Sequence, residues 1–130
     1  MSAFLVAVGG AAGSLLRFWM SGVAQRSVPA TGAWSVFPAG TLTVNVLGCL
    51  IAGALTEVGE RHGPLSNETR ALLMVGFLGG FTTFSAFANE TVVVWRWGAT
   101  AMSLANIALS VVLCLAAVVA GRGLMAAIVK

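Results

Sequence analysis

The stretch that decides the fold is GFLGGFTTFSAF, residues 76–87, which lies inside an uncharged run from residue 71 to residue 89. Two adjacent glycines followed by two β-branched threonines are poor formers of a continuous helix. In lipid, each backbone group freed by a helix break must meet protein, water or an ion. We therefore predict a membrane helix that breaks at a buried site near the bilayer midplane. The alternative is an unbroken helix whose small residues form a packing face.

The composition of the whole chain agrees with a membrane location. Of its 130 residues, 58% are hydrophobic and 8% are charged, whereas a soluble domain has about 25% charged residues. A membrane-spanning helix needs about 20 apolar residues. The uncharged runs cover residues 2–16, 27–56, 71–89 and 97–121. They predict a single all-α membrane domain over residues 1–130, with helices at about 2–24, 38–57, 68–94 and 98–120, which excludes a typical soluble enzyme.

The charges are few and dispersed, so they give no basis for nucleic-acid binding. With four spans, one side of the membrane carries Arg61, Arg70, Arg122 and Lys130, and the other carries Arg17, Arg26 and Arg96. This difference barely favours either orientation under the positive-inside rule. Such a chain can insert both ways and pair with its own inverted copy, a symmetry that larger transporters achieve with inverted repeats. A parallel oligomer is the alternative.

The predicted break indicates two kinds of ion contact. Broken membrane helices present carbonyls to cations and amides to anions, so two antiparallel copies would bring carbonyls together around one small cation. Phe84 and Phe87 follow the break, and the hydroxyls of Thr83 and Ser85 lie beside them. Because the edge of a phenyl ring is positive, this pair would stabilise an anion weakly enough to let it leave. Aromatic packing is the simpler interpretation.

Further polar residues lie within the predicted spans. Asn45 and Asn106 fall at similar depths, and Ser110 lies one helical turn from Asn106 on the same face, so the three could form a ladder of hydrogen-bond donors. They could equally hold helices together. Arg17 and Glu90 lie at comparable depth, and we expect each to be paired or to extend its charge to the membrane interface. Our hypothesis is that they form a salt bridge that stabilises the subunit or lines a vestibule.

Two other residue types give no site. Cys49 and Cys114 lie in apolar runs, where cysteine usually behaves as a small hydrophobic residue, and we infer neither a disulfide nor a metal site from them. No nucleophile, base and orienting group converge in the sequence. The sequence therefore predicts no enzyme.

Three segments together resemble the Fluc (CrcB) family of fluoride channels. They are GGAAGSLLRF at residues 9–18, GTLTVN at residues 40–45, and the stretch at residues 76–87. The resemblance implies a four-span, dual-topology, antiparallel homodimer in the bacterial cytoplasmic or inner membrane. Such a dimer passively exports fluoride through two pathways and contains a central structural sodium ion, with membrane lipid around it.

The resemblance also assigns roles to residues. It makes Phe84 and Phe87 the ring-edge pair and Asn45 a donor in the pathway. Ser85 and Ser110 correspond to pathway hydroxyls, the backbone carbonyls of Gly79 and Thr82 would hold sodium, and Arg17 matches the arginine of the first helix. Two positions are less typical: Ala86 stands where the family commonly has threonine, and Asn106 lies where the family varies.

Two other functions are compatible with four small spans. A dual-topology multidrug exporter needs a carboxylate embedded in the membrane, normally in the first helix, but that helix contains Arg17 and no acid. A noncatalytic subunit of a membrane assembly would use its small residues for packing alone.

Overall fold

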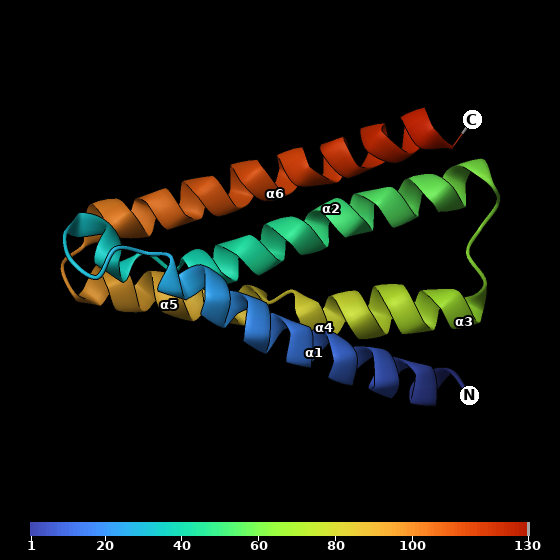
Figure 1. Ribbon diagram of the computed structural model, residues 1–130, viewed down its shortest axis with the longest axis horizontal. Helices are drawn as coiled ribbons and strands as arrows, with labels where there is room; N and C mark the ends of the chain where they lie inside the picture. Colours follow the sequence, from blue (N-terminus) through green and yellow to red (C-terminus); the bar gives the residue numbers. More distant parts are fainter. Residues whose placement is uncertain (130) are drawn as a thin grey trace.

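The computed structural model describes residues 1–129 and is built from helices joined by short links (Figure 1). In chain order they are α1 (Ser2–Arg26), the 3-10 helix η1 (Ala33–Val36), α2 (Ala39–Arg61), α3 (Asn67–Thr69), the π-helix η2 (Arg70–Leu78), α4 (Gly79–Phe81), α5 (Phe84–Arg96) and α6 (Thr100–Ile128).

Four segments are long and apolar enough to cross a membrane: Ser2–Arg26, Ala39–Arg61, Asn67–Arg96 and Thr100–Ile128. This confirms the predicted number of spans. The second and fourth helices continue beyond the predicted ends near residues 57 and 120 because the charges there are paired. Glu57 is buried and accepts from Arg61, and Arg122 forms ion pairs with Glu57 and Glu60. Charges that are neutralised between two helices do not end either helix.

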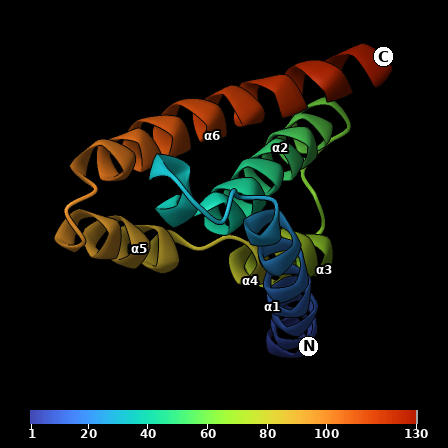
Figure 2. The ribbon, with the colours of Figure 1, turned by 60° about the vertical axis from the view of Figure 1, so that its left-hand side comes forward.

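The helices pack as two adjoining pairs. In Figure 1, α2 and α6 run side by side in the same direction, and α1 lies along the segment from α3 to α4. The connections that contain η1 and residues 97–99 lie at one end of the molecule, and both termini lie at the other. Turning the molecule shows α5 beyond the extended link that follows α4 (Figure 2), where α5 packs against α6.

The distribution of side chains is the reverse of that in a water-soluble domain. The buried polar residues are Thr41, Glu57, Thr91, Ser103, Asn106 and Ser110, whereas large apolar side chains are exposed along all four spans. Contiguous apolar surface of this kind marks a face covered by lipid or by another protein. The polar side chains are inside because their hydrogen bonds can be satisfied only by protein there.

The third span is broken, as the sequence predicts. Thr82 and Thr83 have extended backbones, with φ and ψ of −91° and 158° at Thr82 and −154° and 115° at Thr83. The glycines do not form the break, because Gly79 and Gly80 are helical in α4. The interruption falls on the threonines, whose β-branched side chains favour extended backbone.

Candidate functional site

The break is held by one side chain of α2. The Asn45 Nδ2 group donates to the Thr83 carbonyl at 3.1 Å, and the Thr83 N–H donates to Asn45 Oδ1 at 2.8 Å. One amide thus satisfies both backbone groups of an extended residue, as a neighbouring strand would. Asn45 was predicted as a donor in an anion pathway. In the structure one of its amide hydrogens and its oxygen bind the backbone, and an amide has a second hydrogen.

The break redirects two amides that a continuous helix would aim at carbonyls four residues earlier. The Thr83 N–H donates to Asn45 instead of to the Gly79 carbonyl. The Ala86 N–H donates to the Thr83 hydroxyl at 3.2 Å instead of to the Thr82 carbonyl. The carbonyls of Gly79 and Thr82 therefore lose their helical donors. The family resemblance implies that the same two carbonyls bind sodium, which stays a prediction.

The side chain of Thr82 is fixed between two helices. Its hydroxyl donates to the Leu78 carbonyl at 2.9 Å, which also accepts from the Thr82 N–H at 2.9 Å. Its methyl group faces Gly48 of α2, where a Cβ atom would overlap Thr82 Cγ2. The close approach of α2 to the break therefore requires glycine at position 48.

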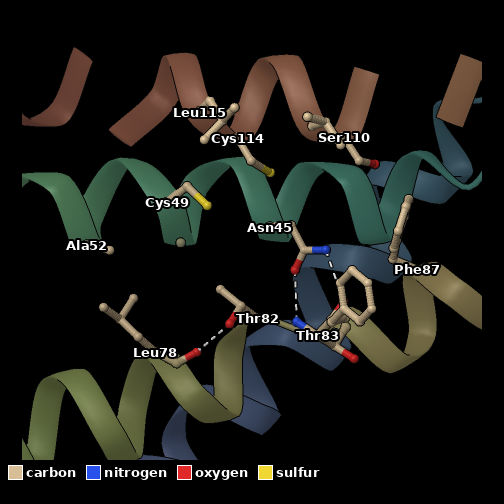
Figure 3. A pocket seen from close by; sticks show the side chains of 13 residues that line it. Asn45, Cys49, Ala52, Leu78, Thr82, Thr83, Phe87, Ser110, Cys114 and Leu115 are labelled. Atoms are coloured by element: carbon tan, nitrogen blue, oxygen red, sulfur yellow. Dashed lines mark hydrogen bonds between the residues drawn. The ribbon is translucent and has the colours of Figure 1, made fainter. Parts of the chain in front are cut away.

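A cavity of about 470 Å³ opens beside the break, between α2, α5 and α6 (Figure 3). Its walls are Asn45, Gly48, Cys49, Ala52, Leu78, Thr82, Thr83, Phe84, Phe87, Ser110, Val111, Cys114 and Leu115, and none of these side chains is charged. The structure thus brings together five of the predicted anion-pathway residues, namely Asn45, Thr83, Phe84, Phe87 and Ser110. Ser85 does not line the cavity; its hydroxyl lies 3.2 Å from that of Thr83.

The four phenylalanines of the third span fall into two pairs on either side of the break. Phe77 and Phe81 stack with centroids 5.7 Å apart, and Phe81 is 1% exposed. Phe84 and Phe87 are tilted by 48° with centroids 5.3 Å apart. Phe84 is 79% exposed although it lines the cavity. Phe81 of the first pair lies in the core, and the second pair lines the cavity and is available to a ligand.

Asn106 joins α6 to α5 inside the protein. Its Nδ2 group donates to the Thr91 hydroxyl at 2.8 Å, and that hydroxyl donates to the Phe87 carbonyl at 2.6 Å. The Ser110 hydroxyl donates to Asn106 Oδ1 at 3.4 Å. The predicted ladder therefore includes Asn106 and Ser110, whereas Asn45 belongs to the separate contact with Thr83. Asn106 is 1% exposed and acts as a link between helices.

The predicted salt bridge between Arg17 and Glu90 is wrong. Both residues line one cavity of about 290 Å³, but no ion pair joins them among the described residues. Glu90 Oε1 accepts instead from the Thr41 hydroxyl at 2.8 Å, and the buried Glu90 Oε2 has no hydrogen-bond partner within residues 1–129. Equal depth in the membrane did not fix the direction in which the two side chains point. That Arg17 and Glu90 line a vestibule stays a prediction.

Sequence reasoning missed several residues around the site. Thr41 contacts Glu90, Thr91 bridges two helices, and Ser103 donates to the Thr91 carbonyl at 2.9 Å. Each is a small polar residue in an apolar run, a signal too common to single out any one of them. Cys49 and Cys114 were read as isolated apolar residues, yet they line the same cavity.

The arrangement can bind ions of both signs at separate places. The C-terminal end of α4 presents carbonyl oxygens, which attract a cation, and the N-terminal end of α5 presents amides, which attract an anion. The cavity adds a donor amide, hydroxyls and ring edges, all without a fixed countercharge. Among the described residues there is no cluster of three or more His, Cys, Asp or Glu side chains that could hold a metal ion.

Comparisons with known proteins agree with the motifs. The family model described as CrcB-like protein, Camphor Resistance (CrcB), matches residues 4–122. A protein of Rhizobium etli (strain CIAT 652), named fluoride-specific ion channel FluC, is 45% identical over 129 residues, which cover 98% of each chain. Proteins with that name from Rhizobium etli (strain ATCC 51251 / DSM 11541 / JCM 21823 / NBRC 15573 / CFN 42) and Rhizobium leguminosarum bv. trifolii (strain WSM2304) are both 46% identical, over 130 and 129 residues. These alignments cover 99% and 98% of both chains.

Proposed function

The chain belongs to the CrcB family, and we propose that it is a fluoride-selective channel through which the ion leaves the cell passively. Its relatives carry the name of a fluoride-specific ion channel over nearly their whole length. The chain is a multi-pass membrane protein, with four apolar spans. The proposal identifies the transported ion with the one in the relatives' name.

The observation that supports a channel most strongly is the uncharged cavity beside the broken helix. Fluoride is small and strongly hydrated, so a pathway must replace its water with close donors. The second amide hydrogen of Asn45 and the edges of Phe84 and Phe87 supply such contacts. The Ser110 hydroxyl would supply another by turning away from its 3.4 Å bond to Asn106 Oδ1. Because no cation is fixed in these walls, the ion is not trapped and can leave, as conduction requires.

The direction of flow needs no energy source within the protein. A membrane potential negative inside drives an anion outward, by about 2.3 kcal/mol per charge for each 100 mV. Hydrogen fluoride formed in acidic surroundings enters a cell as a neutral molecule and releases fluoride in the more neutral cytosol. A selective passive pore therefore suffices to relieve fluoride toxicity.

The dimer is part of the proposal. Phe84 is 79% exposed in one protomer, although its ring lines the cavity, so a second copy would complete that side of the pathway. The nearly equal basic charge on the two sides supports an inverted partner. An inverted pair would give two pathways related by an axis in the membrane plane.

The backbone at the break fits a sodium ion. The carbonyls of Gly79 and Thr82 have lost their helical donors. The Thr83 N–H donates to Asn45 instead, and the Ala86 N–H donates to the Thr83 hydroxyl. Two inverted copies would bring four such oxygens together, and hard cations favour oxygen ligands. A bound ion would neutralise the partial charge of the carbonyl ends and hold the two protomers together. Asn45 and Thr83 set the direction of these carbonyls.

The experiment that tests the function is ion release from liposomes. Purified protein is reconstituted into vesicles loaded with fluoride and chloride, and a potassium ionophore sets the potential. We expect rapid release of fluoride, measured with an ion-selective electrode, while chloride is retained. A folded, membrane-inserted protein that releases neither ion would support an assembly subunit instead, and equal release of both would remove the selectivity.

A further inference from the structure

The cavity contains a pair of cysteines that the proposed conduction does not use. Cys49 lies on α2 and Cys114 on α6, both are free thiols, and both line the cavity. Figure 3 shows the two side chains on neighbouring helices, among the residues that line the cavity.

The packing of the two helices explains why the thiols meet. At Gly53, a Cβ atom would lie only 3.0 Å from Val118 Cα, so α2 and α6 are in close contact there. The helices run in the same direction, and Cys49 and Cys114 each lie four residues before that contact. Residues four apart share a helix face. The cysteines therefore form the next layer of the same seam.

The layer beyond the cysteines is the polar end of the cavity. Asn45 and Ser110 each precede a cysteine by four residues, and both line the cavity. The thiols thus lie between the close contact of α2 with α6 at Gly53 and the groups proposed to contact fluoride. Any ligand bound to the thiols occupies the wall of the pathway.

We propose that Cys49 and Cys114 together bind a soft metal ion such as Cd²⁺, and that the bound ion closes the pathway. Thiolates are the soft ligands of proteins and favour soft metals over the hard cations of cells. Binding breaks two S–H bonds, forms two bonds from sulfur to the metal and releases two protons to water. No electron is transferred, so no oxidant is needed.

Closure follows from the position of the bound ion. A divalent ion between the two thiolates, with the water that fills its remaining coordination positions, takes up space in the cavity one helical turn from Asn45 and Ser110. The space left for fluoride becomes too narrow to pass, and the ion cannot displace the soft metal's thiolates because fluoride is a hard ligand. This step rests on the proposed channel function, whereas metal binding does not.

Metal binding is tested on the purified protein in detergent. Cd²⁺ is added while the ultraviolet absorption of sulfur-to-cadmium charge transfer and the release of protons are recorded. We expect one ion and two protons per protomer. Cys49→Ser and Cys114→Ser should each weaken binding on the order of 10²-fold, because the second ligand is no longer held at high effective concentration. Binding that is equally tight in either single variant would overturn the two-thiol site.

Closure is tested by fluoride release from liposomes with and without Cd²⁺, each protein being compared with its own metal-free rate. The unaltered protein should lose most of its release and recover it when EDTA is added, and each serine variant should keep its own rate. Unchanged release from a protein that binds Cd²⁺ through both sulfurs would overturn closure. Absence of release before any metal is added would instead refute the channel function. The binding titration would then still test whether both thiols bind the metal.

Discussion

Asn45→Ala is the change that most clearly tests whether the helix break is held in place by side-chain hydrogen bonds or is only a flexible segment. It removes the bonds of 2.8 Å and 3.1 Å by which Asn45 binds the N–H and the carbonyl of Thr83. A hydrogen bond contributes about 0.5 to 1.5 kcal/mol in soluble proteins and about 0.6 kcal/mol on average between membrane helices. Two bonds therefore contribute about 1 to 3 kcal/mol. We take about 2 kcal/mol as the free energy by which Asn45 stabilises the broken helix.

The assay is fluoride release per folded protein in liposomes. A loss of about 2 kcal/mol in the conducting geometry corresponds to about 30-fold slower release, at 1.36 kcal/mol per factor of ten. The amount of folded protein is taken from size-exclusion chromatography, so that poor folding is not counted as slow conduction.

Gln25→Ala is the matched control. The Gln25 side chain binds the backbone in the same two-bond manner, donating to the Phe37 carbonyl at 3.0 Å and accepting from the Gly40 N–H at 3.1 Å. It does so away from the break, so this variant should lower the melting temperature while release per folded protein stays unchanged. A loss smaller than about threefold for Asn45→Ala, equal to about 0.7 kcal/mol, would refute the role of Asn45. An equal loss for Gln25→Ala would refute its specificity.

Three further predictions concern contacts around the site. Gly48→Ala places a methyl group against the threonine at the break and should destabilise the protein by about 1 to 3 kcal/mol, seen as a lower melting temperature; Gly22→Ala, which has open space around it, should not. Because Arg17 and Glu90 form no ion pair, a double-mutant cycle with glutamine at both positions should give a coupling energy below about 0.5 kcal/mol, and a coupling of several times that value would restore the salt bridge. Asn106→Leu removes the link between α5 and α6 and should cost about 1 kcal/mol in denaturant unfolding; an unchanged midpoint would argue against that link.

The spans and the break were predictable because they depend on local sequence. Uncharged apolar runs of this length are stable when lipid surrounds them. The threonines at positions 82 and 83 weaken a helix in any surroundings. The exact break was less predictable, since the glycines before it are tolerated in helix. What places the break at the threonines is Asn45, a residue 38 positions away that binds Thr83.

The pairing of polar side chains was only partly predictable. The four-residue spacing within one helix correctly placed Ser110 beside Asn106. Depth does not give the rotation of one helix against another, so Glu90 meets Thr41 and not Arg17. The packing of α2 against α6 likewise brings Cys49 and Cys114 to one cavity, which no local pattern in either helix indicates.

The measurement that tests the central claim most directly compares fluoride release by Phe84→Ile and Phe4→Ile. Both phenylalanines are largely exposed in the protomer, at 79% and 70%, so burial does not distinguish them. Phe84 lines the cavity at the break, and Phe4 lies near the start of α1. We predict that Phe84→Ile abolishes most fluoride release while Phe4→Ile conducts at the unaltered rate. Equal and undiminished release by both variants would contradict a fluoride pathway over the broken helix.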